Sequence, residues 1–322
     1  MDSAETYANV KDHYAEIARC TAVADHAEDY QEKVATAFGY KLEDLRSLPR
    51  NANLGVGCGN PLATANVEKG ETVIDLGCGG GIDVLLAASK VGLGGKAVGV
   101  DMTKDMLDLA RRNAEKAGLS NVSFIEASIT SIPLDSSVAD CIISNCVGNL
   151  VPELDKPLVF REMFRLLKPG GRIAISDILA KKAFPSEVKE NISLYVGCVA
   201  GASEVRDYER YLKDAGFEGT LAVFFSSLSV LIFNTNSDLN VYKEMLQAEQ
   251  PKYNGSPSRP QSQNSSCSCC NAGSCCSLQK GEFQGRAESI LKLNFNNWAG
   301  SFRVYAIKPK FEIEPAIAPS KE

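Results

Sequence analysis

The sequence predicts an α/β fold with a mostly parallel, doubly wound sheet, an N-terminal helical cap and a small C-terminal appendage. From Glu71 onward, short apolar runs alternate with longer segments of helical periodicity, and this alternation is typical of βαβ units with right-handed crossovers. A glycine-rich turn over residues 77–81 directly follows the first apolar run. Ligands of open α/β sheets bind at such a position, beyond the carboxyl end of a strand.

The expected elements follow the chain in order. Residues 1–50 form the cap, with helical spacing at 7–19 and 30–38. The βαβ series is expected at residues 72–76, 82–90, 97–100, 104–116, 122–127, 139–144, 155–167 and 172–178. Lys168-Pro-Gly-Gly171 predicts a turn before the last of these strands. Residues 187–200 and 205–215 should be helical, and residues 217–233 should form strands that close the sheet.

Composition excludes several classes of protein. The chain has 322 residues, of which 44% are hydrophobic and 23% charged, and no apolar run is long enough to cross a bilayer. Its acidic start lacks the apolar core of a secretory signal, so we expect a cytoplasmic protein with no membrane partner. A net charge of -6 and a pI near 5.3 argue against nucleic acid as a partner.

A donor site is predicted where the first two strands end. The glycines of Asp75-Leu-Gly-Cys-Gly-Gly-Gly81 allow a tight turn and close approach of a ligand, and Asp101 ends the next strand, where its carboxylate can accept ribose hydroxyls. Ile82 replaces the last glycine of the NAD fingerprint. The pattern therefore predicts S-adenosylmethionine and a Rossmann-like class I methyltransferase. The residues expected to bind the donor are Asp75, Gly77, Cys78, Gly79, Asp101, Met102, Ser128 and Ile129.

Asp83, at the start of the following helix, has two interpretations that the sequence does not separate. Its charge can complement the helix dipole, or its carboxylate can contact the ligand.

The second observation is the number of cysteines, eleven. In a cytoplasmic chain of this length, cysteines bind metals or take part in catalysis more often than they form disulfides. Cys58 precedes Asn60-Pro61, a predicted helix N-terminus that would lower the pKa of its thiol. Cys146 follows a strand at the ligand-binding edge, and Cys198 falls in a predicted helix between glycines. Any one cysteine is more often a small buried apolar residue, the interpretation kept for Cys78 and Cys141.

With these motifs, the chain resembles the arsenite S-adenosylmethionine methyltransferases over about residues 10–217. The resemblance runs through Ala52-Asn-Leu-Gly-Val-Gly-Cys-Gly-Asn-Pro61, Gly70-Glu-Thr-Val-Ile-Asp-Leu-Gly-Cys-Gly-Gly-Gly81, Gly99-Val-Asp-Met102, Ile143-Ser-Asn-Cys-Val147 and Gly197-Cys-Val-Ala-Gly-Ala202. It implies that Cys58, Cys146 and Cys198 bind trivalent arsenic and that Cys20 takes part in thiol–disulfide exchange. Two departures stand out: Gly148 replaces a larger residue, and Glu153-Leu154 look inserted.

The chemistry follows from the soft character of arsenic. Trivalent arsenic held by three thiolates keeps a lone pair that can attack a sulfonium methyl group without a general base. The only histidines, His13 and His26, lie outside the predicted core. Glutathione or thioredoxin would return the thiols to the reduced state, and the chain is expected to act as a monomer.

Other functions compete with this one. The main alternative is a methyltransferase of a small organic molecule of sterol or quinone type, which would use the same donor site without needing three thiolates. A sequestration protein would use the cysteines but leave the donor site unexplained. Zinc is a further possibility at Cys267–Cys276.

The predicted boundaries assign residues 1–50 to the cap, 51–240 to the methyltransferase domain with its arsenic site, 241–280 to a low-complexity cysteine-rich linker, and 281–322 to the C-terminal appendage.

Overall fold

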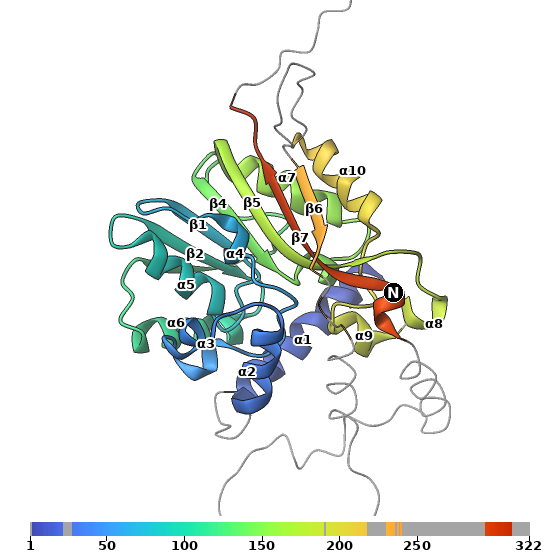
Figure 1. The fold of residues 1–322 in the computed structure, drawn as a ribbon, viewed down its shortest axis with the longest axis horizontal. Coiled ribbons are helices and arrows are strands. Elements are labelled where there is room, and N and C mark those ends of the chain that lie inside the picture. Colours follow the sequence, from blue (N-terminus) through green and yellow to red (C-terminus); the bar gives the residue numbers. More distant parts are fainter. Residues whose placement is uncertain are drawn as a thin grey trace, which may run out of the picture.

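The computed structural model describes residues 2–21, 28–189, 191–217, 230–235, 237, 239 and 294–310. Its centre is a seven-stranded sheet in the order β3-β2-β1-β4-β5-β7-β6 (Figure 1). The strands are β1 (Thr72–Leu76), β2 (Lys96–Asp101), β3 (Val122–Glu126), β4 (Ala139–Asn145), β5 (Leu167–Ala180), β6 (Val230–Asn234) and β7 (Ala299–Ile307). The first five pair in parallel, so the predicted mostly parallel α/β fold is confirmed.

Helices surround this sheet and extend past its carboxyl edge. They are α1 (Ser3–Thr21), α2 (Glu28–Ala37), α3 (Leu42–Arg46), α4 (Leu62–Ala65), α5 (Ile82–Val91), α6 (Lys104–Lys116), α7 (Lys156–Leu166), α8 (Ser186–Lys189), α9 (Ile192–Val196) and α10 (Val205–Ala215). Short 3-10 turns lie at η1 (Arg50–Ala52), η2 (Gly148–Leu150) and η4 (Phe295–Asn297). None of the helices in these described ranges has the length and apolar character needed to cross a membrane.

The sheet separates two apolar cores because alternate residues of a strand face opposite sides. Ile74 and Ile142 pack in the core that includes residues of α7 and α10, whereas Val73 and Ile143 pack in the core that includes residues of α4 and α5. All four side chains are fully buried. Because both faces of these strands are buried, their sequences are nearly continuous apolar runs.

The order of the strands sets the place of the site. The chain moves outward from β1 through β2 to β3 and then crosses back to β4, on the other side of β1. Such a reversal opens a crevice beyond the carboxyl ends of the two adjacent strands. Asp75 and Ile143 are paired across these strands near that edge.

The C-terminal segment, expected to be a small appendage, contributes a strand to the sheet itself. Strand β7 lies inside the sheet, antiparallel to both β5 and β6, with Ile173 opposite Ala306 and Ile232 opposite Val304. A low-complexity run suggests a boundary, but strand pairing depends on partners far away in the sequence, and here β7 completes the sheet. Residues 240–293, which include the whole predicted linker (241–280) with Cys267–Cys276, lie outside the described ranges, as do residues 218–229 of the predicted closing strands.

Two local predictions are wrong. The helix expected at 187–200 is instead divided into α8 and α9, after which Cys198 adopts a left-handed φ of 63° in a turn. The turn expected at Lys168-Pro-Gly-Gly171 lies within β5, which begins at Leu167 opposite Ala139 and shifts register before Arg172. In both places the chain pairs with neighbours that a local pattern does not reveal.

Candidate active site

The glycine-rich loop turns sharply between β1 and α5. Gly77, Gly79 and Gly81 have φ values of 69°, 51° and 99°, a region that side chains other than that of glycine rarely adopt. The amides of Gly77 and Cys78 donate to the carbonyl of Val100 at 2.7 and 3.0 Å. These bonds hold the loop against the end of β2, so that glycine backbone faces the crevice.

Asp101 lies at the end of β2, where the sequence places it. One carboxylate oxygen accepts the amide of Gly79 at 3.0 Å, and the other accepts the amide of Thr103 at 2.8 Å. Burial raises the pKa of Asp101, and the two amides act in the opposite direction. A carboxylate held by backbone donors in this way is fixed in position while it keeps lone pairs for the hydroxyls of a ligand.

A cavity runs from Asp101 and the glycine-rich loop to Cys146. Six of the eight predicted donor residues line it: Gly77, Gly79, Asp101, Met102, Ser128 and Ile129. Asn145 and Cys146 line it from the end of β4, and α1 contributes Tyr7, Val10 and Tyr14. The cavity therefore combines a hydrogen-bonding carboxylate, apolar walls and, at one end, the sulfur-bearing residue Cys146.

Helix α1 covers the cavity and is tied to the other side of it. The Tyr7 hydroxyl donates to Asp155 at 3.2 Å, and the Tyr14 hydroxyl donates to the carbonyl of Val196 at 3.1 Å. These bonds connect the cap to the segments before α7 and at the end of α9.

Asp75 and Cys78 line a second, adjoining cavity together with Asp83 and Tyr40. The Tyr40 hydroxyl donates to Asp83 at 2.7 Å, and the Asn145 amide donates to the same carboxyl group at 3.1 Å. Burial raises the pKa of Asp83 to about 6. Asp83 is thus part of a buried polar cluster that the sequence did not reveal, although Asn145 directly precedes the cysteine that the motif singles out.

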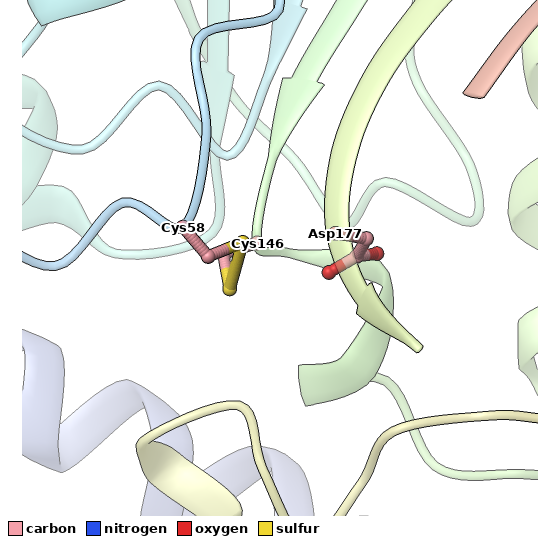
Figure 2. Close-up of side chains that lie close together, drawn as sticks. All are labelled: Cys58, Cys146 and Asp177. Atoms are coloured by element: carbon pink, nitrogen blue, oxygen red, sulfur yellow. A yellow bond between two sulfur atoms is a disulfide. The ribbon is translucent and has the colours of Figure 1, made fainter. Parts of the chain in front are cut away.

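Cys58 and Cys146 meet at the edge of the sheet and are joined by a disulfide, with Cα atoms 5.7 Å apart (Figure 2). Cys58 comes from the loop before α4, and its amide donates to the side chain of Asn145 at 3.1 Å. Cys146 follows β4 with a left-handed φ of 61°, and its amide donates to the carbonyl of Ser176 at 2.8 Å. Both side chains are buried.

The predicted cause of a low thiol pKa at Cys58 is not supported. Helix α4 has only four residues, and in the disulfide Cys58 carries no titrating thiol.

Cys198 lies beside this pair, although not on the helix that the sequence predicts. Its thiol donates to the carbonyl of Cys146 at 2.7 Å, and its own carbonyl accepts the Asn149 amide at 3.3 Å. Burial raises the pKa of the Cys198 thiol above its usual range. The structure thus brings the three predicted cysteines to one place, with two sulfurs bonded and the third directed at the backbone of the second.

A carboxyl group that the sequence missed completes the surroundings. Within the described part of the chain, Cys58, Cys146 and Asp177 form the cluster whose ligand atoms all lie within 4.8 Å of one another (Figure 2). Asp177 accepts the Tyr208 hydroxyl at 2.7 Å and the Asn149 amide at 3.0 Å. Burial raises the pKa of Asp177 to about 7. Its place in a predicted strand, directly after a serine, gave no signal of this role.

This cluster gives a physical reason for Gly148. A Cβ atom added there would lie 2.9 Å from an Asp177 oxygen and 3.1 Å from the Tyr208 hydroxyl. The small residue leaves room for the hydrogen bond between those two side chains.

The apparent insertion at Glu153-Leu154 also has a local role. Glu153 pairs with the buried Lys156 at 2.7 Å, and Lys156 in turn donates to the carbonyl of Gly201 at 2.5 Å and to Ser203 at 2.8 Å. These contacts hold the chain that follows Cys198.

The other three cysteines in the described ranges lie apart from this cluster. Cys20 is exposed near the end of α1, whereas Cys78 and Cys141 are buried. Nothing in these positions tests the exchange role expected for Cys20, which stays a prediction.

Comparison with known proteins gives similar methyltransferases. The Methyltransferase domain family matches residues 67–216. The chain is 46% identical to an arsenite methyltransferase of Halobacterium salinarum over 56% of this chain and 46% of that protein, and 40% identical to one of Aquipseudomonas alcaligenes over 50% and 47%. Among solved structures, it resembles an arsenic(III) S-adenosylmethionine methyltransferase from Chlamydomonas reinhardtii with a TM-score of 0.51 and 25% identity, over 88% of this chain and 75% of that one.

These comparisons confirm the expected resemblance and the class I methyltransferase fold. The chain spans about half the length of the curated relatives that it matches.

Proposed function

We propose that this chain, a relative of the arsenite methyltransferases with a methyltransferase domain at residues 67–216, transfers methyl groups from S-adenosylmethionine to trivalent arsenic. The observation that carries the proposal is the cavity that runs from Asp101 to Cys146, with Cys58 and Cys198 next to Cys146. It supports a donor and a thiol-bound acceptor at the two ends of one space.

The donor's expected place agrees with the residues present. Asp101 would accept the ribose hydroxyls, Met102 and Ile129 would flank the base, and the backbone of Gly77 and Gly79 would face the methionine end. When bound, S-adenosylmethionine supplies an electrophilic methyl group on sulfur. Helix α1 would exclude water from the space between donor and thiols, because it covers the cavity and is tied to its far side.

Arsenic is the substrate, and the chain's part is to bind it and aim its lone pair. Three thiolates from Cys58, Cys146 and Cys198 would replace three hydroxyl groups of arsenous acid, which leave as water with the thiol protons. The lone pair left on a three-coordinate arsenic would attack the methyl group as the bond between that carbon and the sulfonium sulfur breaks. The donor would leave as its neutral thioether, S-adenosylhomocysteine, with that bond's electron pair on sulfur, and arsenic would be formally oxidised from the trivalent to the pentavalent state. No side chain has to remove a proton in that step.

The disulfide between Cys58 and Cys146 supports a need for reductant. Two cysteines joined to each other cannot hold arsenic, so two electrons must arrive before substrate binds. A dithiol such as thioredoxin, or two molecules of glutathione, would supply them by thiol–disulfide exchange. The activity then belongs in a reducing compartment such as the cytoplasm, and because one chain supplies all three cysteines, a monomer suffices.

The test is methyl transfer itself. The reduced protein is incubated with arsenite and S-adenosylmethionine labelled on its methyl group, and labelled arsenicals are separated by chromatography. We expect label on arsenic only when a thiol reductant is present. Label absent from arsenic but present on a quinone or sterol acceptor would replace this proposal with the organic-substrate alternative.

A further inference from the structure

We propose that, once their disulfide is reduced, Cys58 and Cys146 form a zinc site with the carboxylate of Asp177, distinct from the arsenic site in its third ligand. The proposal does not depend on methyl transfer. It also differs from a zinc site within Cys267–Cys276, which would use other cysteines.

The ligand set and its spacing suit zinc. In the described chain, the two sulfurs and a carboxylate oxygen of Asp177 lie within 4.8 Å of one another (Figure 2). With bonds of about 2.3 Å to sulfur and about 2.0–2.2 Å to oxygen, ligand atoms around a tetrahedral zinc lie roughly 3.5–3.8 Å apart. Reduction frees the two sulfurs to separate to that spacing, and small side-chain rotations bring the oxygen in.

The electrostatics of Asp177 favour a cation at this place. The residue is fully buried, and its two side-chain hydrogen bonds come from neutral groups, the Tyr208 hydroxyl and the Asn149 amide. Its other hydrogen bonds, from the backbone of Ile178 and Gly148, are neutral as well. Among the described residues, no lysine, arginine or histidine forms an ion pair with it, and the nearby Lys156 pairs with Glu153. Buried carboxylates are normally paired with a cation or bound to a metal.

The two side-chain hydrogen bonds would orient Asp177 as a ligand. Each donor binds one carboxylate oxygen, which leaves a further lone pair on that oxygen for a metal. Outer contacts of this kind are typical of metal sites, where they fix the direction of the ligating atom. The fourth position of zinc would face the cavity that Cys146 lines and would hold water.

Zinc and arsenic would select different third ligands. Zinc accepts mixed sulfur and oxygen ligands, whereas trivalent arsenic prefers three sulfurs. Cys198 is placed to supply the third sulfur, because its thiol contacts the backbone of Cys146. Asp177 would therefore serve zinc, and Cys198 would serve arsenic.

Zinc binding exchanges protons on the ligands for the metal ion. A phosphine first reduces the disulfide and takes an oxygen from water, which leaves two thiols. Zn²⁺ then replaces the two thiol protons and any proton on the Asp177 carboxyl group, so two to three protons are released per zinc and no electron is transferred.

The experiment uses the full chain in which Cys267, Cys269, Cys270, Cys275 and Cys276 are replaced by serine, so that these thiols do not bind the metal. The protein is reduced with a phosphine, desalted under argon and titrated with Zn²⁺ in competition with a chromophoric chelator. We expect one tight zinc per chain after reduction and none at this site in the disulfide form. X-ray absorption should find two sulfur ligands together with oxygen.

Substitutions distinguish Asp177, the proposed third ligand of zinc, from Cys198, the proposed third ligand of arsenic. Asp177→Asn should weaken zinc binding by at least about 10–100-fold, whereas Cys198→Ser should leave it unchanged. Asp140→Asn, at a half-buried carboxylate of β4 paired with Lys168, is the matched control. If Asp177→Asn does not fold, Tyr208→Phe keeps the carboxylate but removes its donor, and it should weaken binding about 10-fold.

Three results would overturn the proposal. They are a reduced protein that binds no zinc, a folded Asp177→Asn variant that binds it as tightly as its parent, and a site with three sulfur ligands that Cys198→Ser destroys.

Discussion

The two halves of the carboxyl edge are built in different ways. The donor half is local, since the loop at residues 77–81 follows β1 directly and Asp101 is held by amides from that loop and from its own neighbour Thr103. The thiol half combines distant segments, because Cys58, Cys146 and the turn at Cys198 meet from three parts of the chain. Damage to one half should therefore leave the other working.

The largest effect should come from Cys198→Ser. A hard, weakly acidic hydroxyl does not replace a thiolate on arsenic, so we expect methyl transfer to arsenite to fall to the rate without enzyme. The affinity for S-adenosylmethionine, measured by calorimetry, should not change, because Cys198 does not line the donor end of the cavity. Cys141→Ser, another buried cysteine, is the control. Full arsenite turnover by Cys198→Ser would remove this residue from the arsenic site.

A smaller effect is expected from Asp101→Ala, and it should fall on binding of the donor instead of binding of arsenic. Loss of a buried acceptor costs about 1–3 kcal/mol, which corresponds to roughly 5- to 150-fold weaker binding of S-adenosylmethionine. Binding of arsenite by the reduced thiols should stay the same, as measured by protection of the cysteines from alkylation. Asp105→Ala, at a carboxylate on α6 that pairs with Arg19 on the surface, is the control. If both variants bind the donor equally well, the assignment of Asp101 is wrong.

The third effect concerns the stability of the fold and its dependence on pH, and it tests the burial of Asp177 in the thiol half. The pKa of Asp177 is about 7 in the fold against an ordinary value of 3.8. Between about pH 4 and pH 7, the native state therefore holds a proton that the unfolded chain has lost, and the free energy of unfolding falls as pH rises. The slope is at most about 1.4 kcal/mol per pH unit for one proton.

The measurement is urea unfolding of the reduced, metal-free protein and of Asp177→Asn at several pH values. The difference in stability between them isolates this carboxyl group from others, such as Asp83, which acts in the same direction. Asp177→Asn should depend less steeply on pH across this window. Identical slopes for the two proteins would show that Asp177 titrates as an ordinary exposed carboxylate.

The same contrast explains how far the sequence could be interpreted. Periodicity and the glycine turn predict β1 to β5 and the donor residues, because each signal lies within a few neighbouring positions. Asp177 and Tyr208 were missed, since their significance depends on a contact between β5 and α10 that no local pattern encodes. The three cysteines were singled out by their unusual sequence context, but the turn at Cys198 was predicted as helix although glycines lie on both sides of it.

The position of β7 has a consequence for synthesis. Ribosomes deliver the chain from its N-terminus, so β5 is made long before the strand that pairs with it, and until then its edge is open to other chains. The thiol half of the site also depends on β7, because the Ser301 hydroxyl on that strand donates to the carbonyl of Cys58 at 2.7 Å. Closing a loop costs little more as it lengthens, about 0.6 kcal/mol for each doubling. A long separation between β6 and β7 along the sequence therefore adds little to the cost of pairing these strands, but the described sheet stays incomplete until residues 299–307 have been made.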